Sequence, residues 1–332
     1  MHPLKSIFEL FLLTILVGTS GCIHTYPSPE ETIDPTKIEM VVVLHFNEEW
    51  DDKVYTQTAS EVSRASAHPR RIYIEITGRS GKPRSYTKII QPEEISDGTY
   101  RLELPSKVKA DTYSLAVWCD CLNPTTLEPV AYDISNPYLI KELVARGEES
   151  DRRMCLTGRQ EIDLRPMSGK WNVAAETEIT LSTPMARFRL VADDYQEFLR
   201  QTEDARKKGE KYYVTVNYIS DIPGGFSLIN GKPMDPVSGA RFSGALPILL
   251  YPGIEVSIGS DWLFNTSGEY PHTVTVTVFN SAQVMVSKTS GITFPMRCGH
   301  ITTVKGKLLT NFISGGIQID NLWAGEIIIE LD

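Results

Sequence analysis

A cysteine near the start of the chain lies in a context that favours covalent acylation. Cys22 ends the run Thr19-Ser20-Gly21-Cys22. Small residues directly before a cysteine are typical of the site where a bacterial signal peptide is cut and the thiol is lipidated. The apolar residues 7–17 are too few to span a bilayer, which needs about 20, but they suit an export signal. We therefore predict a signal peptide over residues 1–21 and a lipid anchor such as palmitate on Cys22. The alternative is a buried thiol behind an ordinary secretory signal.

The other cysteines permit one disulfide. Cys119, Cys121, Cys155 and Cys298 are an even number in a chain that we expect to be exported to an oxidising compartment. Cys119 and Cys121 are two residues apart on an expected strand, where a bond between them would be strained. We therefore predict a disulfide between Cys121 and Cys155. A metal site is the alternative, but no histidine or second close cysteine pair completes a tetrahedral ligand set.

The polar residues form no catalytic pattern. Asp193 and Asp194 are adjacent, and such neighbours point to opposite faces of a strand, whereas both suit the start of a helix. The six histidines are scattered, and neither a Gly-x-Ser-x-Gly nor a His-Glu-x-x-His motif occurs. The segment Pro223-Gly224-Gly225 lacks the lysine of a phosphate-binding loop, so it predicts a turn between strands. We predict a non-enzymatic protein without a cofactor or metal.

Length and charge limit the organisation and the partners. The formal charge of −9 and the absence of a dense Lys/Arg run argue against nucleic acid as a partner. The mature chain exceeds the size of one ordinary domain. Residues 22–37, rich in Pro, Ser, Thr and Glu, predict a flexible tether. A break at Ser182-Thr183-Pro184 predicts two domains, residues 38–182 and 183–332.

The dominant hydrophobic period is two, which predicts strands. Helical patterns occur after Asp194, where Tyr195, Phe198 and Leu199 share a face, and over Pro137 to Arg146. The sequence therefore predicts an all-β protein of antiparallel β-sandwiches with minor helices. The predicted strands include residues 41–46, 72–77, 100–104, 113–119, 177–181, 186–191, 212–218, 273–278 and 304–309.

Three segments carry a resemblance to a known family. Residues 113–120 contain Tyr-x-x-x-x-Trp-x-Asp; residues 185–190 precede Asp193 and a helix; and residues 315–320 read Gly-Gly-Ile-Gln-Ile-Asp. In this order behind Cys22, the segments resemble fimbrillin-type surface lipoproteins of the type V pilus class. The resemblance implies two tandem transthyretin-like domains and a stalk, tip or anchor subunit that supports adhesion. It also implies an outer-membrane lipoprotein at the surface of a Gram-negative bacterium, with other fimbrial subunits as partners.

The resemblance further implies assembly by strand exchange. In that class, a protease cuts a pilin after an arginine, an N-terminal strand leaves, and a neighbour's strand fills the groove. The first arginine after Cys22 precedes Ala65, so Arg64-Ala65 is the candidate processing site. A cut there permits polymerisation; an uncut chain is an anchor or terminator, with Arg64 an ordinary solvated loop residue. The candidate exchanged residues are Val41, Val43, Leu44 and Phe46 of the first strand and Ile327, Ile328, Ile329 and Leu331 of the last.

A glycan-binding surface lipoprotein is the alternative function. Tandem β-sandwiches on a lipid tether also serve as carbohydrate-capture modules, whose mark is exposed aromatic side chains. Trp118 alternates with apolar neighbours and is predicted to lie in the core. The aromatic candidates are Trp50, Trp171, Trp262, Trp323 and the pair Tyr212-Tyr213.

Overall fold

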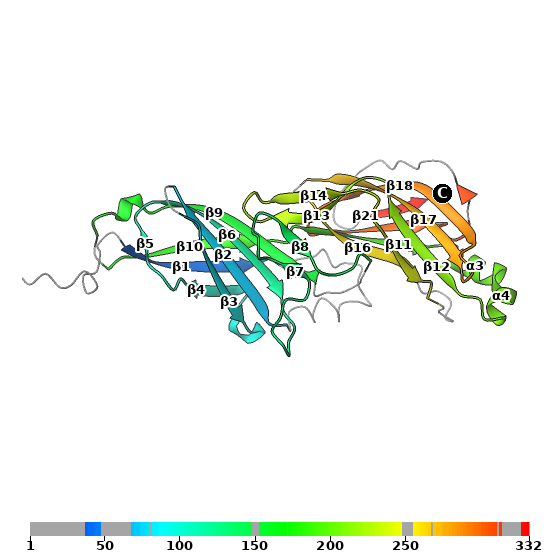
Figure 1. The fold of residues 1–332 in the computed structure, drawn as a ribbon, viewed down its shortest axis with the longest axis horizontal. Coiled ribbons are helices and arrows are strands. Elements are labelled where there is room, and N and C mark those ends of the chain that lie inside the picture. Colours follow the sequence, from blue (N-terminus) through cyan, green and yellow to red (C-terminus); the bar gives the residue numbers. More distant parts are fainter. Residues whose placement is uncertain are drawn as a thin grey trace, which may run out of the picture.

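Strands dominate the structure. The computed structural model describes residues 37–47, 68–79, 82–147, 153–170, 172–247, 255–266, 268–310, 312–313 and 327–331, the last two ranges as backbone. The helices in these ranges are few and short, so the predicted all-β class is confirmed. The elements form two groups that lie end to end along the long axis of the molecule (Figure 1). None of the described helices is long and apolar enough to cross a lipid bilayer.

The N-terminal group consists of two facing sheets. One has the strand order β10-β1-β4, with β5 also paired to β1, and the other has the order β3-β2-β6-β9. Ile72 and Ile74 of β2, Leu115 and Val117 of β6 and Val42 of β1 share one buried cluster. Because these residues recur with period two, a shift of register by one residue would turn them to the opposite face of their sheet. The bounds are β1 Lys37–Phe46, β2 Arg70–Gly78, β3 Arg84–Ile90, β4 Thr99–Glu103, β5 Val108–Lys109, β6 Thr112–Cys121, β9 Cys155–Asp163 and β10 Ala174–Leu181.

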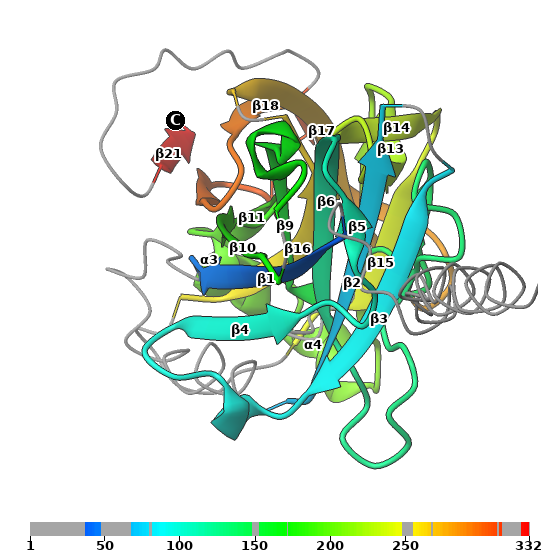
Figure 2. The ribbon, with the colours of Figure 1, turned by 90° about the vertical axis from the view of Figure 1, so that its left-hand side faces the viewer.

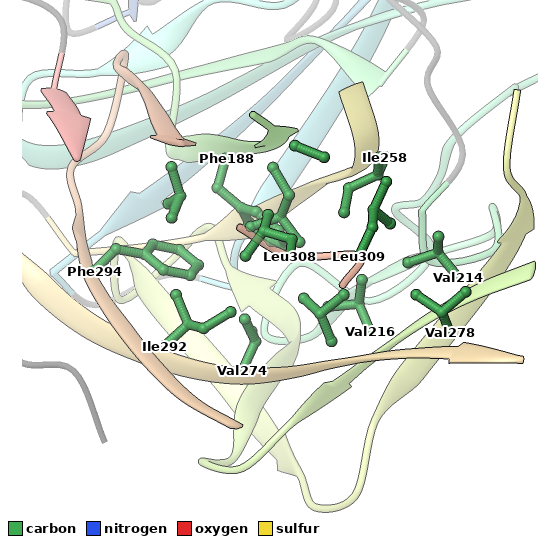
Figure 3. Close-up of a cluster of buried hydrophobic side chains, with 14 of the residues drawn as sticks. Phe188, Val214, Val216, Ile258, Val274, Val278, Ile292, Phe294, Leu308 and Leu309 are labelled. Carbon is green, nitrogen blue, oxygen red and sulfur yellow. The ribbon is translucent and has the colours of Figure 1, made fainter. Parts of the chain in front are cut away.

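The C-terminal group also has two facing sheets. Their strand orders are β16-β11-β19-β21 and β15-β12-β17-β18-β20. Phe188 of β11 and Phe294 of β18 meet with ring centroids 5.0 Å apart, and Leu308 packs into the same cluster (Figure 3). The bounds are β11 Met185–Ala192, β12 Tyr212–Tyr218, β15 Arg241–Ala245, β16 Ser257–Phe264, β17 Tyr270–Asn280, β18 Met285–Met296, β19 Ile301–Gly306, β20 Phe312–Ile313 and β21 Ile327–Leu331.

A fifth sheet joins the two groups. Its order is β14-β13-β8-β7, built from β7 (Tyr132–Asp133), β8 (Ile140–Glu142), β13 (Ile222–Ser227) and β14 (Lys232–Val237). The prediction of a turn at residues 223–225 is wrong, because these residues lie inside β13. A Cβ on Gly225 would lie 2.4 Å from the carbonyl oxygen of Ile140, so glycine allows β8 to approach.

The two α-helices in the described part of the chain follow β11. They are α3, Tyr195–Gln201, and α4, Glu203–Lys207; short 3₁₀ turns occur at Pro92–Glu94 and Arg165–Met167. The helix predicted after Asp194 is therefore confirmed. The helix predicted over Pro137 to Arg146 is wrong, because this segment contains β8, whose pairing with β7 and β13 overrides the local apolar spacing.

Four strand pairs depart from the predicted antiparallel arrangement. Pairs β1–β10, β11–β19, β18–β20 and β19–β21 are parallel among the described strands. In each group, the first strand lies beside a late strand that runs in the same direction. The strand predicted over residues 304–309 also ends early, since β19 stops at Gly306. Leu308 and Leu309 are nevertheless fully buried.

Candidate strand-exchange site

Strand β1 fills the centre of its sheet. It pairs in parallel with β10 and antiparallel with β4, so that Val42 lies between Thr177 and Leu102. The amide of Leu104 donates to the Met40 carbonyl at 2.9 Å on one side. Figure 2 shows β1 and β4 next to each other, seen from the N-terminal end of the molecule. Because strands flank β1 on both sides, its removal would leave a groove with two open hydrogen-bonding edges.

The even-numbered residues of β1 fill the core. Met40, Val42 and Leu44, together with Ile38, are buried in the cluster between the two N-terminal sheets. Alternate residues of a strand point to opposite faces, so the predicted contacts Val41 and Val43 lie on the outer face. Of the predicted β1 residues, Leu44 is fully buried in the core, and Phe46 packs against it partly buried. The displaced strand predicted from the resemblance, Met40 to Phe46, includes Met40 and Val42 but leaves out Ile38.

Ion pairs lie across the outer face of β1. Arg101 of β4 and Glu176 of β10 form a salt bridge that spans the strand between them. Glu39 at the start of β1 forms an ion pair with Lys107, with 2.9 Å between the Glu39 Oε1 and Lys107 Nζ atoms. These side chains are well exposed, so solvent screens the pairs and each contributes little to stability. The buried inner face is therefore the main attachment of β1.

Strand β21 is an edge strand. Its backbone pairs in parallel with β19, from Ile327 opposite Thr302 to Leu331 opposite Gly306. The sheet ends there in the described part of the chain, whereas β19 continues inward to β11. The predicted donor residues Ile328 and Ile329 thus lie in a strand that pairs with one neighbouring strand, β19.

The predicted modification residues lie outside the described residues. These are Cys22 and the candidate processing site, Arg64 and Ala65. In the sequence, Arg64 comes after β1 and before β2. A cut at this bond would therefore separate β1 from the rest of the polypeptide.

The predicted disulfide is not formed. Cys121 and Cys155 are both buried, and no disulfide joins them in the described part of the chain. Cys155 lies opposite Asp120 in the β6–β9 register, so its side chain shares a face with Asp120, whereas Cys121 is the next residue along β6. The two sulfurs therefore lie on opposite faces of the sheet. Burial raises the pKa of the Cys155 thiol well above its ordinary value.

Family membership follows from the sequence match. A family model described as a family of unknown function, DUF6562, covers residues 35–332. The chain belongs to DUF6562. No curated protein matches this DUF6562 chain.

Solved structures similar to this DUF6562 chain include fimbrial and adhesin proteins of Bacteroidetes. A fimbrial assembly protein from Parabacteroides distasonis is 14% identical, with a TM-score of 0.40 over 81% of this chain and 90% of that one. A fimbrial anchor protein from Porphyromonas gingivalis is 12% identical, with a TM-score of 0.39 over 76% and 82%. A Bacteroides thetaiotaomicron protein for which polysaccharide binding is inferred is 11% identical, with a TM-score of 0.46 over 76% and 80%. These TM-scores lie below 0.5, a similarity too low to transfer a function.

A buried charge cluster between the two groups was missed from the sequence. The guanidinium of Arg153 donates to Asp261 at 2.8 Å and to Glu142 at 3.0 Å, and the hydroxyl of Tyr218 donates to Asp261 at 2.8 Å. Burial opposes the charge on Arg153, but the carboxylates of Glu142 and Asp261 outweigh it and raise the guanidinium pKa. Burial raises the pKa of Glu142, although Arg146 and Arg153 oppose this.

The cluster explains why the two groups are held together. Arg153 and Glu142 come from the N-terminal half, and Asp261 and Tyr218 come from the C-terminal half. No sequence signal could have found it, because Arg153 and Asp261 are 108 residues apart. Within the described residues, no group of three or more His, Cys, Asp and Glu side chains could hold a metal ion.

Asp194 also has a role that the sequence did not reveal. It stands at the N-cap of α3, but its side chain makes no capping hydrogen bond. Its carboxylate instead accepts the amides of Leu308, Leu309 and Thr310 at 3.1, 2.9 and 2.7 Å. Asp194 thus ties the start of the helix to the chain that follows β19.

Proposed function

We propose that this protein is a lipid-anchored fimbrial subunit of the cell surface that joins other subunits by β-strand exchange and supports adhesion. The single observation that carries the proposal is the central position of β1 between β4 and β10. Since β1 comes before the candidate processing bond, one cut could free the strand that fills the middle of a sheet. A strand from another subunit could then restore both ladders and the buried face.

The last strand has a sequence suited to that groove. In β1, buried residues recur with period two at Met40, Val42 and Leu44. In the sequence of β21, Ile327, Ile329 and Leu331 recur with the same period, with Glu330 between the last two. Three apolar residues on one face of a strand could replace three others in a core. Since β21 pairs along one edge, it is also the described strand of its sheet that could leave with the smallest loss of pairing.

The N-terminal features complete the proposal. Acylation of Cys22 would hold the protein at the outer membrane, and residues 22–37 would link the lipid to a first domain of residues 38–182. The second domain, residues 183–332, would begin just before β11. The proposed partners are other fimbrial subunits, and the proposed role requires no cofactor and no catalytic centre. If the bond after Arg64 stays intact, β1 remains and the protein would act as an anchor or terminator.

A matched pair of variants in the native cells tests strand donation. We expect Ile329→Lys to prevent the protein from entering surface polymers, because a lysine would interrupt the apolar face. Glu330→Lys adds the same side chain at a position that is already charged, so polymers should persist. The readout is the polymer ladder in the surface-sheared fraction under mild denaturant. Polymers of unchanged number and length after deletion of residues 327–332 would disprove donation.

The mature N-terminus tests the other half of the proposal. Mass spectrometry of the protein from native membranes and polymers should find an acylated Cys22 on the anchored form. It should find Ala65 as the first residue of a subunit inside a polymer. Arg64→Lys should block a protease specific for arginine and leave β1 in place. Polymerised protein that retains acylated Cys22 and all of β1 would contradict the cleaved version.

A further inference from the structure

A cavity of about 420 Å³ opens beside the sheet that joins the two groups. The β13–β14 hairpin forms one part of its lining, and the end of β16 and the start of β17 form another. This volume is typical of small-molecule pockets, which are concave and mostly apolar with a few placed polar groups. The lining residues are Asp221, Ile222, Pro223, Pro233, Met234, Pro236, Phe264, Asn265, Thr266, Tyr270 and His272.

The apolar lining includes an exposed aromatic ring. Tyr270 is 51% exposed, and its ring contacts that of His272 edge-on, with centroids 5.3 Å apart. Pro223 and Pro236 lie opposite each other in the hairpin, so rigid rings form part of the lining. Met234 is exposed at the same cavity. Exposed apolar side chains that gather at one place beside polar residues are typical of ligand-binding grooves.

The polar lining is fixed in place and includes an unsatisfied atom. The amide of Asn265 donates to the Met296 carbonyl at 2.8 Å, and its oxygen accepts the Thr266 amide at 2.8 Å. His272 is 2% exposed, and its Nδ1 atom has no hydrogen-bond partner. Burial lowers the pKa of His272 to about 4, so the imidazole is neutral at pH 7. The polar lining residues that a ligand can reach are the exposed Asp221 and Thr266, whose oxygen atoms suit a ligand that brings hydroxyl groups.

The charge of the lining selects among such ligands. Of the described residues that line the cavity, Asp221 alone is charged at neutral pH. Its Oδ1 accepts the Ser238 hydroxyl at 2.6 Å, which holds the carboxylate in place. A carboxylate accepts hydrogen bonds from hydroxyl groups and repels an acidic ligand. The cavity therefore suits a neutral ligand that has both apolar faces and a polar rim.

We infer that this cavity binds a neutral pyranose sugar. The ring of such a sugar has apolar C–H faces that suit Tyr270 and the proline rings, and a rim of hydroxyls that suit Asp221 and Thr266. The site goes beyond the proposed assembly role and does not depend on strand exchange.

Saturation-transfer NMR on the full-length protein tests the inference. The probes are the methyl glycosides of glucose, galactose and mannose, with glucuronic acid as an acidic comparison. We expect saturation of at least one neutral glycoside and weaker saturation of glucuronic acid. Loss of the aromatic ring in Tyr270→Ala should weaken binding on the order of tenfold. Tyr138→Ala is the matched control, because Tyr138 is 54% exposed but does not line the cavity.

A second variant keeps the test sharp if Tyr270→Ala changes the fold. Asp221→Asn removes the carboxylate that would accept the ligand's hydroxyl groups and should also weaken binding, with folding checked by circular dichroism. The inference is overturned if no neutral glycoside receives saturation. It is equally overturned if both variants bind as tightly as the natural protein, or if glucuronic acid binds best.

Discussion

The two halves of the molecule share one strand topology. In the N-terminal half, β1 lies between antiparallel β4 and parallel β10; in the C-terminal half, β11 lies between antiparallel β16 and parallel β19. The facing sheets also correspond, with β3-β2-β6-β9 matching β15-β12-β17-β18. The sequence shows no short repeat, so the correspondence between the halves is visible only in the pairing of their strands.

The additions to this shared topology distinguish the halves. The C-terminal half gains an edge strand on each sheet, β20 beside β18 and β21 beside β19. In the N-terminal half, β10 is the last strand of its sheet within the described residues. It carries Glu176 and Glu178, and charged side chains are a common protection of an edge strand. The strands after β19 are therefore additions to sheets that are already complete, whereas β1 is part of its sheet.

The largest expected effect concerns the contact between the halves. Asp261→Ala would leave the buried Arg153 and Tyr218 without a shared partner, and breaking a buried ion pair costs about 3–5 kcal/mol. We expect the free energy of unfolding in urea to fall by that amount. Glu203→Ala is the control, because Glu203 forms an exposed pair with Lys207, and its loss should leave the free energy of unfolding almost unchanged. Equal effects of the two substitutions would contradict the role of the cluster.

The next prediction tests whether β1 and β11 are equivalent. Leu44 of β1 and Leu190 of β11 are both fully buried, each in the core of its own half. Leucine-to-alanine substitutions in a core cost about 2–5 kcal/mol, so both variants should lose stability within this range. Val43→Ala, on the outer face of β1, should cost about 1 kcal/mol or less. A variant Leu44→Ala as stable as Val43→Ala would show that β1 is not a working part of its sheet.

The alternating residues explain how much the sequence revealed. Period two placed β2 and β17 because apolar residues such as Ile72 and Val276 recur at every second position and point to the core. The same pattern did not decide whether the odd- or the even-numbered residues of β1 face the core, since Val41, Val42 and Val43 put valines on both faces. Residues 223–225 pair with a distant strand and follow no local rule. Asp261 and Arg153 meet through the tertiary fold, which no spacing in the sequence encodes.

A third prediction concerns the pH dependence of stability, which the buried His272 of the C-terminal half should produce. The pKa of His272 falls from 6.5 to about 4 through burial, so the unfolded chain binds this proton first as the pH falls. Stability from this group is complete above about pH 7 and declines between about pH 6.5 and 4, by about 3 kcal/mol in total. His272→Gln cannot titrate, so urea unfolding across this range should show the variant losing less stability than the natural protein. Parallel profiles would contradict the prediction.

The smallest expected effect concerns the outer face of β1. Arg101 and Glu176 join β4 to β10 across β1, yet both side chains are about half exposed, so their attraction is screened. In a double-mutant cycle with Arg101→Gln and Glu176→Gln, the coupling should be about 0–1 kcal/mol and should shrink with added salt. A coupling above about 2 kcal/mol would mean that these charges hold β1 in place. Exchange of β1 would then depend on breaking them, and the buried Met40, Val42 and Leu44 would no longer decide how firmly the strand is held.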